Sequence, residues 1–305
     1  MRDQFALFVY YHETDIKIGS SVKIMTMYIG YRGIANKILL YVVLCLISMA
    51  ILFPIVWMLL SSFKTDAEAL RSPITWFPHN PTVENYVKIW QIKPFLLFFL
   101  NSIIAAGGTA SISTIIGCLA GYGFSRFMFF GRTFLIGLFL VTQMLPGVLF
   151  IGPYFKILSF THLYNTRIGV IIAYVTLCLP FCAWMSKAFI DTIPKELDES
   201  AMIDGGSRLT VFFRIVMPLA LPGIAATFIF GFLLAWQDLL LVSALTYSES
   251  LQTVTLGIAR LIGEFRVRWT MLMAGSLVGM MPAIVLYSIM QRHLVKGLSV
   301  GAVKG

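Results

Sequence analysis

Charged residues are scarce in this sequence. Only 12% of its 305 residues are Asp, Glu, Lys or Arg, and 58% are hydrophobic, whereas charged residues make up about 25% of an ordinary soluble domain. A water-soluble protein of this length could not bury so much apolar surface, so lipid must be the solvent for most of the chain. The net charge of +9 does not indicate a nucleic-acid partner, because the basic residues lie in short connections between apolar runs.

Reactive groups are missing where an enzyme or an ion-driven carrier would need them. The four cysteines lie inside apolar runs with no histidine or acid beside them, so they predict neither a metal site nor a disulfide framework. The four histidines all lie in connections or termini, which argues against a proton-coupled carrier and an intramembrane hydrolase. No GxxxxGK[ST] phosphate loop occurs. We therefore predict no catalytic residue, metal ligand or cofactor in this chain.

Apolar stretches long enough to cross a bilayer occur six times. Each approaches or exceeds the roughly 20 residues that a helical crossing needs, and lipid offers the backbone no other hydrogen-bond partners. The predicted spans are residues 38–63, 94–125, 133–155, 168–186, 215–237 and 269–291. The predicted fold class is therefore an all-α integral membrane protein with six transmembrane helices.

The spans divide the chain into three segments. Residues 1–37 form an N-terminal cytoplasmic segment that we expect to be weakly structured, with Met25 and Met27 as alternative starts. Residues 38–291 form the membrane domain, and residues 292–305 form a tail. Lys and Arg are more frequent in the connections on the side of the two termini, which predicts that both termini are cytoplasmic.

Prolines and glycines indicate that the spans are bent and closely packed. Four prolines lie well inside spans, where each removes a backbone hydrogen bond and favours a kink; they are Pro54, Pro146, Pro180 and Pro282. Gly117 and Gly121, like Gly275 and Gly279, are spaced so that neighbouring helices could approach closely. Such a bundle is typical of a transporter or channel.

The connection between the fourth and fifth spans, residues 187–217, carries the most specific pattern. Pro194 opens a predicted short helix, Gly205 and Gly206 close it, and Ser207 can cap a second helix. This would make an L-shaped projection from the membrane. From these residues alone, the projection is either a docking element for a partner or an ordinary connection between spans.

The same connection resembles the EAA loop of ABC-importer permeases. That loop has Glu-Ala-Ala, three residues, Gly, nine residues and Ile-x-Leu-Pro. This chain keeps the spacing with Glu199-Ser200-Ala201, Gly205 and Ile215-x-Met217-Pro218, and departs from the pattern at Ser200 and Met217. The resemblance implies an ATPase-coupling role for Glu199, Ser200, Ala201, Asp204, Gly205, Ile215 and Pro218.

Further stretches carry the resemblance from about residue 34 onward. Residues 61–65, 120–127, 142–146 and 297–305 are similar to the carbohydrate branch of these permeases, the proteins similar to the maltose-transporter subunit MalG. The resemblance implies an ABC type I importer permease fold in the inner membrane. The implied partners are a second related permease, a homodimeric cytoplasmic ATPase that binds ATP and Mg, an extracytoplasmic binding protein and a carbohydrate. In MalG-like proteins the tail reaches the ATPase, which here concerns Gly301, Lys304 and Gly305.

Polar residues inside the spans are the candidates for contact with a sugar, which needs hydrogen-bonding groups on apolar or aromatic walls. They are Asn101, Thr142, Gln143, Trp236, Gln237 and Asp238. Each also has a local explanation, because Asn and Thr often bond helix backbone and Trp often anchors a span end. Where the family commonly has Trp-Asn-Glu, this chain has Trp236-Gln237-Asp238, so the pattern does not identify the sugar.

Three other functions remain open. The chain could be a permease for a non-sugar solute such as an amino acid or a metal, or a stand-alone secondary carrier or membrane enzyme. The long outer connection, residues 64–93, and the tail favour a carbohydrate permease.

Reporter fusions after Lys88 and after Ser207 test the predicted topology. We expect opposite signals, with the second fusion in the cytoplasm, because the Lys and Arg excess lies on that side. The same signal from both fusions would exclude the six-span arrangement.

Overall fold

The computed structural model describes residues 36–263 and 267–302. The chain divides into two units, Met1–Met58 and Leu59–Gly305. The first unit contributes most of a long helix, Asn36–Ser62, which is apolar on every side and long enough to cross a membrane. Over the described ranges the chain forms helices and no strand, apart from one isolated antiparallel bridge between Ile262 and Val267. The remainder of the N-terminal segment predicted above lies outside the described residues.

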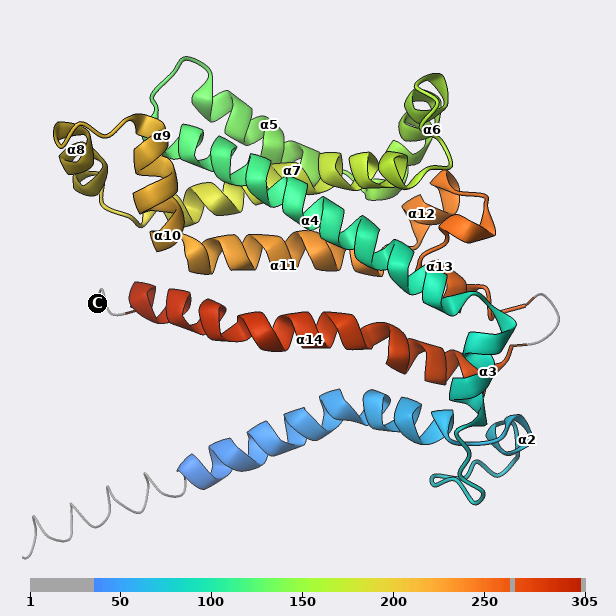
Figure 1. Ribbon diagram of the computed structural model, residues 1–305. Helices are drawn as coiled ribbons and strands as arrows, with labels where there is room; N and C mark the ends of the chain where they lie inside the picture. Colours follow the sequence, from blue (N-terminus) through green and yellow to red (C-terminus); the bar gives the residue numbers. More distant parts are fainter. Residues whose placement is uncertain (1–35, 264–266, 303–305) are drawn as a thin grey trace, which may run out of the picture. The chain divides into compact units, whose positions relative to one another are not determined.

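The second unit is a bundle of long helices (Figure 1). The long helices are α4 (Phe95–Arg126), α7 (Arg167–Asp191), α11 (Leu221–Gln237) and α14 (Trp269–Ala302). Helix α4 packs on both α7 and α11, and α11 also packs on α14. The shorter elements are α2 (Asp66–Ala69), α3 (Glu84–Ile92), α5 (Arg132–Met144), η1 (Gly147–Phe150), α6 (Ile151–Phe160), α8 (Glu196–Ile203), α9 (Arg208–Val211), η2 (Phe212–Val216), α10 (Met217–Leu219), α12 (Leu240–Leu245), η3 (Glu249–Leu251) and α13 (Val254–Ala259).

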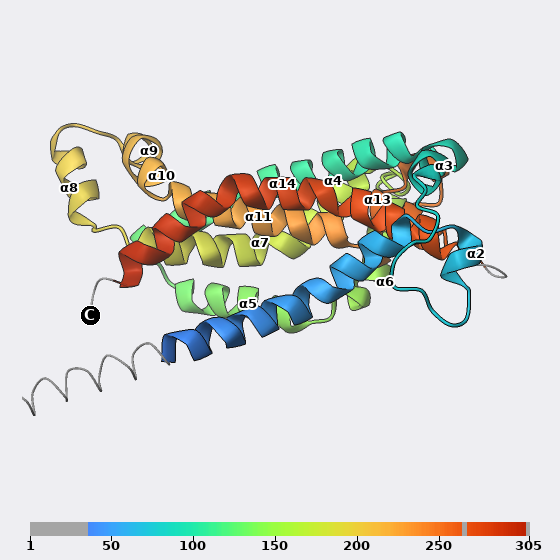
Figure 2. The ribbon, with the colours of Figure 1, turned by 90° about the horizontal axis from the view of Figure 1, so that it is seen from below.

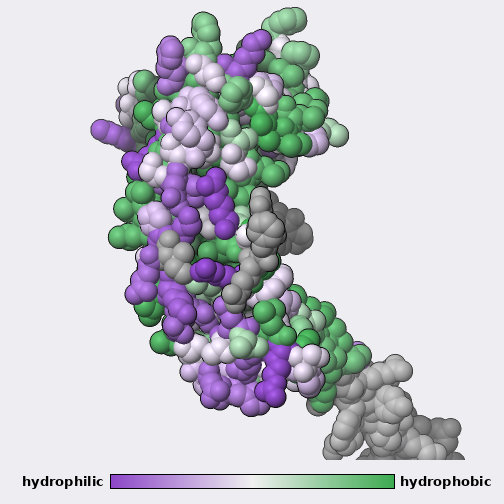
Figure 3. All heavy atoms as spheres, turned by 90° about the vertical axis from the view of Figure 1, so that its right-hand side faces the viewer, coloured by the Kyte–Doolittle hydropathy of each residue, from purple (hydrophilic) through white to green (hydrophobic). Residues whose placement is uncertain are grey.

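Apart from α5, which runs along the bundle, the short helices gather at its two ends (Figure 1). Helices α8, α9 and α10 lie at one end, and α3, α6, α12 and α13 lie at the other (Figures 1 and 2). Hydrophilic side chains are frequent on the face seen from the α3 end, and hydrophobic side chains lie along its flanks (Figure 3). This distribution is expected where an end of the bundle meets water and the sides meet lipid.

Among the described residues, four helices are long and apolar enough to cross a membrane, namely Asn36–Ser62, α4, α7 and Trp269–Ile289 of α14. Two predicted spans are instead bent. Arg132–Met144 meets Gly147–Phe160 at 100°, and Arg208–Leu219 meets Leu221–Gln237 at 80°. Six spans result only if each bent pair counts as one, so the count of six and the placement of the termini stay predictions.

Proline explains one of these bends directly. Pro146 lies in the break between α5 and η1, where a residue without an amide hydrogen ends the α-helical hydrogen-bond pattern. The predicted fifth span begins later than expected, because the π-helical turn η2 and the short α10 precede the bend at Ala220. Helices α7 and α14 continue through Pro180 and Pro282.

Small residues allow α4 and α7 to approach closely. A Cβ atom at Gly117 would lie 2.8 Å from Cys182 Cβ, and one at Gly121 would lie 2.7 Å from the Lys187 backbone nitrogen. Cys178 and Cys182 are fully buried in the same region, with their Sγ atoms 3.3 Å apart. The interpretation of these thiols as small buried residues is confirmed. The close approach predicted from the Gly117 and Gly121 spacing is confirmed as well.

Gly117→Ala should destabilise the folded chain by about 1–3 kcal/mol, the usual cost of overpacking a core. The added methyl would meet Cys182 at both Cβ and the backbone carbonyl carbon, so α4 and α7 must move apart. The measurement is the unfolding midpoint of the purified chain in detergent. Gly107→Ala on the same helix is the control, because nothing lies within 4 Å of its added methyl. Equal midpoints for the two variants would contradict the close contact.

Candidate functional site

The connection that resembles an EAA loop folds as two short helices. Helix α8 begins at Glu196, two residues after Pro194, and ends where Gly205 adopts a left-handed backbone with φ of +87°. Only glycine and a few polar residues adopt that conformation at low cost. Ser207 caps α9 by accepting a hydrogen bond from the Thr210 amide at 3.2 Å. The predicted turn at Gly205 and the cap at Ser207 are both confirmed.

One side of this loop packs on the bundle and the other is exposed. Ala201 is half-buried and lies against an apolar cluster formed by Ile190, Ile193, Val211, Val216 and Ala220. Glu199, Ser200 and Asp204 are exposed. Apolar side chains are exposed beside them, including Ile203 at 86% and Leu209 at 66%. Lys195 and Arg208 are exposed as well. The loop therefore presents charged groups of both signs and large apolar groups together at the end of the bundle.

Ile215 and Pro218 lie in the return from the loop to α11. Ile215 is half-buried within the π-helical turn η2, and Pro218 is exposed within α10. Short π-helical turns are rare and are frequently found at functional sites. Both residues belong to the connection between α9 and α11, after the two short helices of the loop.

A buried ion pair joins the loop to α4. Arg126 Nε donates to Asp198 Oδ2 at 2.7 Å, and the two side chains are only 6% and 8% exposed. The same guanidinium donates to the Ile193 carbonyl oxygen at 2.9 Å and to Ser125 Oγ at 3.2 Å. Neither Arg126 nor Asp198 was a predicted site residue. Nothing in the sequence pairs two residues so far apart, and the one local signal is the arginine at the end of a predicted span.

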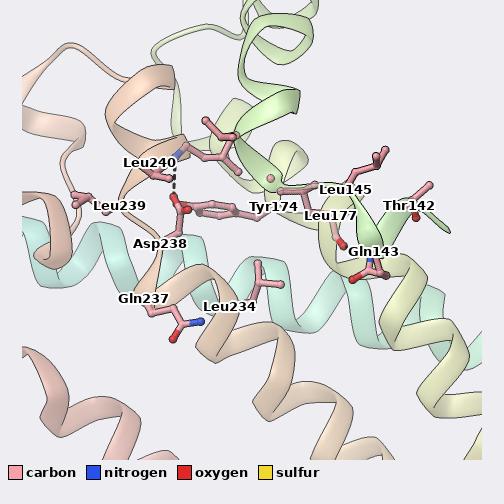
Figure 4. A pocket seen from close by; sticks show the side chains of 13 residues that line it. Thr142, Gln143, Leu145, Tyr174, Leu177, Leu234, Gln237, Asp238, Leu239 and Leu240 are labelled. Carbon is pink, nitrogen blue, oxygen red and sulfur yellow. Dashed lines mark hydrogen bonds between the residues drawn. The ribbon is translucent and has the colours of Figure 1, made fainter. Parts of the chain in front are cut away.

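A cavity of about 560 Å³ lies at the opposite half of the bundle. Its polar walls come from the end of α5 and from the end of α11, as Figure 4 shows. Four predicted pathway residues meet there, namely Thr142, Gln143, Gln237 and Asp238. Tyr174 and several leucines are among the other residues that line the cavity. The break at Pro146 and the end of α11 bring these side chains together.

Asp238 is the best-bonded polar residue of the cavity. Its Oδ2 atom accepts from Tyr174 Oη at 2.8 Å and from the backbone amides of Leu241 and Val242 at 3.1 Å each. The carboxylate thereby holds the start of α12 against α7. Asp238 is thus a structural acceptor as well as part of the wall.

The other polar residues of the wall differ in whether their side chains form hydrogen bonds within the protein. Gln143 Nε2 donates to the Leu177 carbonyl oxygen at 2.9 Å, and Thr142 Oγ1 donates to the Phe139 carbonyl oxygen at 2.7 Å. None of the hydrogen bonds found among the described residues uses the Gln237 side chain. Its amide is therefore available to a molecule in the cavity.

Asn101 and Trp236 do not line this cavity. Asn101 is 2% exposed; its Nδ2 donates to the Ser250 and Gln252 carbonyl oxygens at 2.8 and 2.9 Å, and its Oδ1 accepts from Arg167 Nε at 2.9 Å. Trp236 is 6% exposed and donates to the Gly279 carbonyl oxygen at 3.0 Å. Both side chains hold segments of the bundle together.

The predicted tail site is only partly described. Gly301 lies in the last turn of α14, whereas Lys304 and Gly305 lie outside the described residues. In the described part of the chain, no group of three or more His, Cys, Asp or Glu side chains could hold a metal ion.

Comparison with known proteins places these features in context. Residues 113–300 match the family of binding-protein-dependent transport system inner membrane components. The chain is 36% identical over 254 residues to the sulfoquinovosyl glycerol transport system permease protein SmoH of Agrobacterium fabrum, covering 83% of this chain and 89% of that protein. It is 32% identical over 275 residues to the trehalose/maltose transport system permease protein MalG of Thermococcus litoralis, covering 89% and 98%.

A solved structure shares the fold. It is a chain of a bacterial ABC transporter involved in the import of the acidic polysaccharide alginate, with a TM-score of 0.73 and 19% identity, over 84% of this chain and 95% of that one.

Asp238→Ala should loosen the start of α12 by about 1–2 kcal/mol, the cost of losing a helix-capping acceptor. The amides of Leu241 and Val242 should then exchange with deuterium about 5- to 30-fold faster, as measured by mass spectrometry. Asp238→Asn is the matched control, because an asparagine oxygen caps about as well. If Ala and Asn variants exchange at the same rate, the carboxylate does not hold α12.

Proposed function

Because the chain belongs to the family of binding-protein-dependent transport system inner membrane components, we propose that it forms half of the channel of an ATP-driven carbohydrate importer. The family itself places the chain in the inner membrane as a multi-pass protein. The proposal of an ATP-driven importer rests on the exposed two-helix loop, which contains Glu199 and in which Gly205 turns the chain.

The loop is proposed to dock a cytoplasmic ATPase. Its exposed residues combine acids such as Glu199, bases such as Lys195 and Arg208, and large apolar side chains. This combination is suited to a protein partner with a rim of mixed charge around an apolar groove. Glu199, Ser200 and Asp204 would contact the ATPase, and Ala201 would hold α8 on the bundle. ATP and Mg belong to that ATPase in this proposal, which this chain would serve as a non-catalytic partner.

A second permease is proposed to cover α5. No side chain of α5 is buried, and Phe134, Val141 and Met144 are 73%, 55% and 81% exposed. A helix of this kind next to the cavity suits the interface of two channel halves, where one lining would face the other. The extracytoplasmic binding protein would then deliver the solute at the end opposite α8.

The cavity supports an uncharged carbohydrate as the solute. Its volume lies within the roughly 300–1,000 Å³ typical of small-molecule sites, and its walls offer hydroxyl, amide and carboxylate groups among leucines. No Lys or Arg is among its lining residues in the described part of the chain. An anionic sugar would lie near the Asp238 carboxylate with no compensating cation from this chain's part of the cavity. We therefore propose that Gln143 and Gln237 form hydrogen bonds with hydroxyl groups of a neutral sugar.

Reconstitution tests this function. The chain, its second permease, the ATPase and the binding protein are placed in liposomes, and the solute is the one that mass spectrometry identifies in the binding protein from the native host. We expect that solute to be a neutral sugar whose uptake needs ATP and all the partners. The purified chain alone should hydrolyse no ATP. Uptake by the chain alone, driven by an ion gradient, would contradict the proposal and favour a secondary carrier.

Variants at Gly205 test the loop within the same assay. Gly205→Val should lower uptake about fivefold or more, because a β-branched residue at positive φ costs roughly 1–2 kcal/mol. Gly205→Asn is the control, since asparagine tolerates this conformation. Glu199→Lys reverses a charge on the exposed face and should weaken retention of the ATPase during purification. Wild-type uptake by both Gly205→Val and Glu199→Lys would make the loop an ordinary connection.

A further inference from the structure

Helix α8 has few ties to the rest of the bundle. It packs mainly on α9 and η2, which belong to the same loop. Its bonded link to α4 is the ion pair between Asp198 and Arg126, the last residue of that helix. A force applied to α8 therefore has a direct route into α4 through one side chain.

The Arg126 guanidinium holds three points at once. It bonds Asp198 in α8 at 2.7 Å, the Ile193 carbonyl oxygen just after α7 at 2.9 Å, and Ser125 in α4 at 3.2 Å. The planar fork of arginine suits such a junction, which a lysine could not reproduce. Asp198 Oδ1 is buried and bonds no described group, so the carboxylate depends on Arg126 for its charge compensation.

A buried ion pair adds little net stability compared with an apolar contact of the same size. Replacing such a pair by apolar residues is often neutral or stabilising, whereas removing one partner costs about 3–5 kcal/mol. An apolar contact would thus have attached α8 to α4 equally firmly. What the charged fork adds is a fixed direction and register between α4, α8 and the end of α7.

The opposite end of α4 is bonded just as specifically. Asn101 donates to the Ser250 and Gln252 carbonyl oxygens, and Ser102 Oγ accepts from the Val254 amide at 2.8 Å. About 37 Å of continuous helix separates this clamp from Arg126, at 1.5 Å per residue. Helix α4 contains no proline and runs without a break from Phe95 to Arg126. It therefore connects the loop at one end with the η3–α13 segment at the other.

We propose that Arg126 is a positioning residue that couples α8 to α4, so that movement of the docked loop is carried along α4 to the η3–α13 segment. This inference rests on the proposed function of the loop as the ATPase-docking element. It concerns how the movement is transmitted and leaves the docking face, with Glu199, unchanged.

The main test is the double variant Arg126→Gln/Asp198→Asn in the reconstituted transporter. It removes both charges at nearly constant volume, so no buried charge is left unpaired. We expect the ATPase to remain attached and to hydrolyse ATP, while the amount of solute taken up per ATP hydrolysed falls about tenfold or more. Asp198→Glu keeps the carboxylate and should retain most of that ratio.

Lys187→Gln is the matched control. It breaks an ion pair with Asp191, whose other carboxylate oxygen accepts from Ser125 Oγ at 2.6 Å, and it removes none of the hydrogen bonds that Arg126 itself donates. Uptake per ATP should therefore stay at the wild-type value. A double variant with the wild-type ratio, whether its abundance is normal or reduced, would overturn the positioning role while leaving the proposed function intact. Failure of the wild-type complex to take up solute would instead overturn the proposed function.

Discussion

The contact between α4 and α7 is the constraint on which the remaining geometry depends. Lipid gives two apolar helices no hydrophobic reason to associate, so close packing must hold them together. Gly117 and Gly121 provide it, because their missing side chains leave room for the backbone of α7 at Cys182 and Lys187. This approach brings the end of α4 to the end of α7, where Arg126 can bond the Ile193 carbonyl oxygen.

Irregular backbone occurs where the bundle needs polar groups. In lipid, breaks in a helix are tolerated only where protein or a water-filled cavity satisfies the freed backbone groups. The break at Pro146 lies beside the cavity, and the π-helical turn η2 leads from the loop into α11. These two breaks thus adjoin the cavity and the loop, the two places for which a function is proposed.

Much of the fold class and of the loop could be predicted from local patterns. Apolar runs predicted membrane helices, and the EAA-like spacing predicted a family that the comparisons confirm. The turn at Gly205 was predictable because a left-handed residue after a short helix favours glycine. Two predicted pathway residues, Asn101 and Trp236, lie outside the cavity. Their side chains donate hydrogen bonds to backbone carbonyl oxygens on distant segments.

The sequence by itself determined what is local: the apolar runs, the capped helices of the loop, and the family. Hydropathy along the chain explains the apolar runs, and hydrogen bonds and φ angles of neighbouring residues explain the capped helices. Only the tertiary structure decided which distant residues meet. Arg126 ends α4 and Asp198 lies in α8, and no periodicity relates them. Their pairing follows from the close packing of α4 on α7. A buried carboxylate without a cation would be strongly destabilising, so the fold must bring the two residues together.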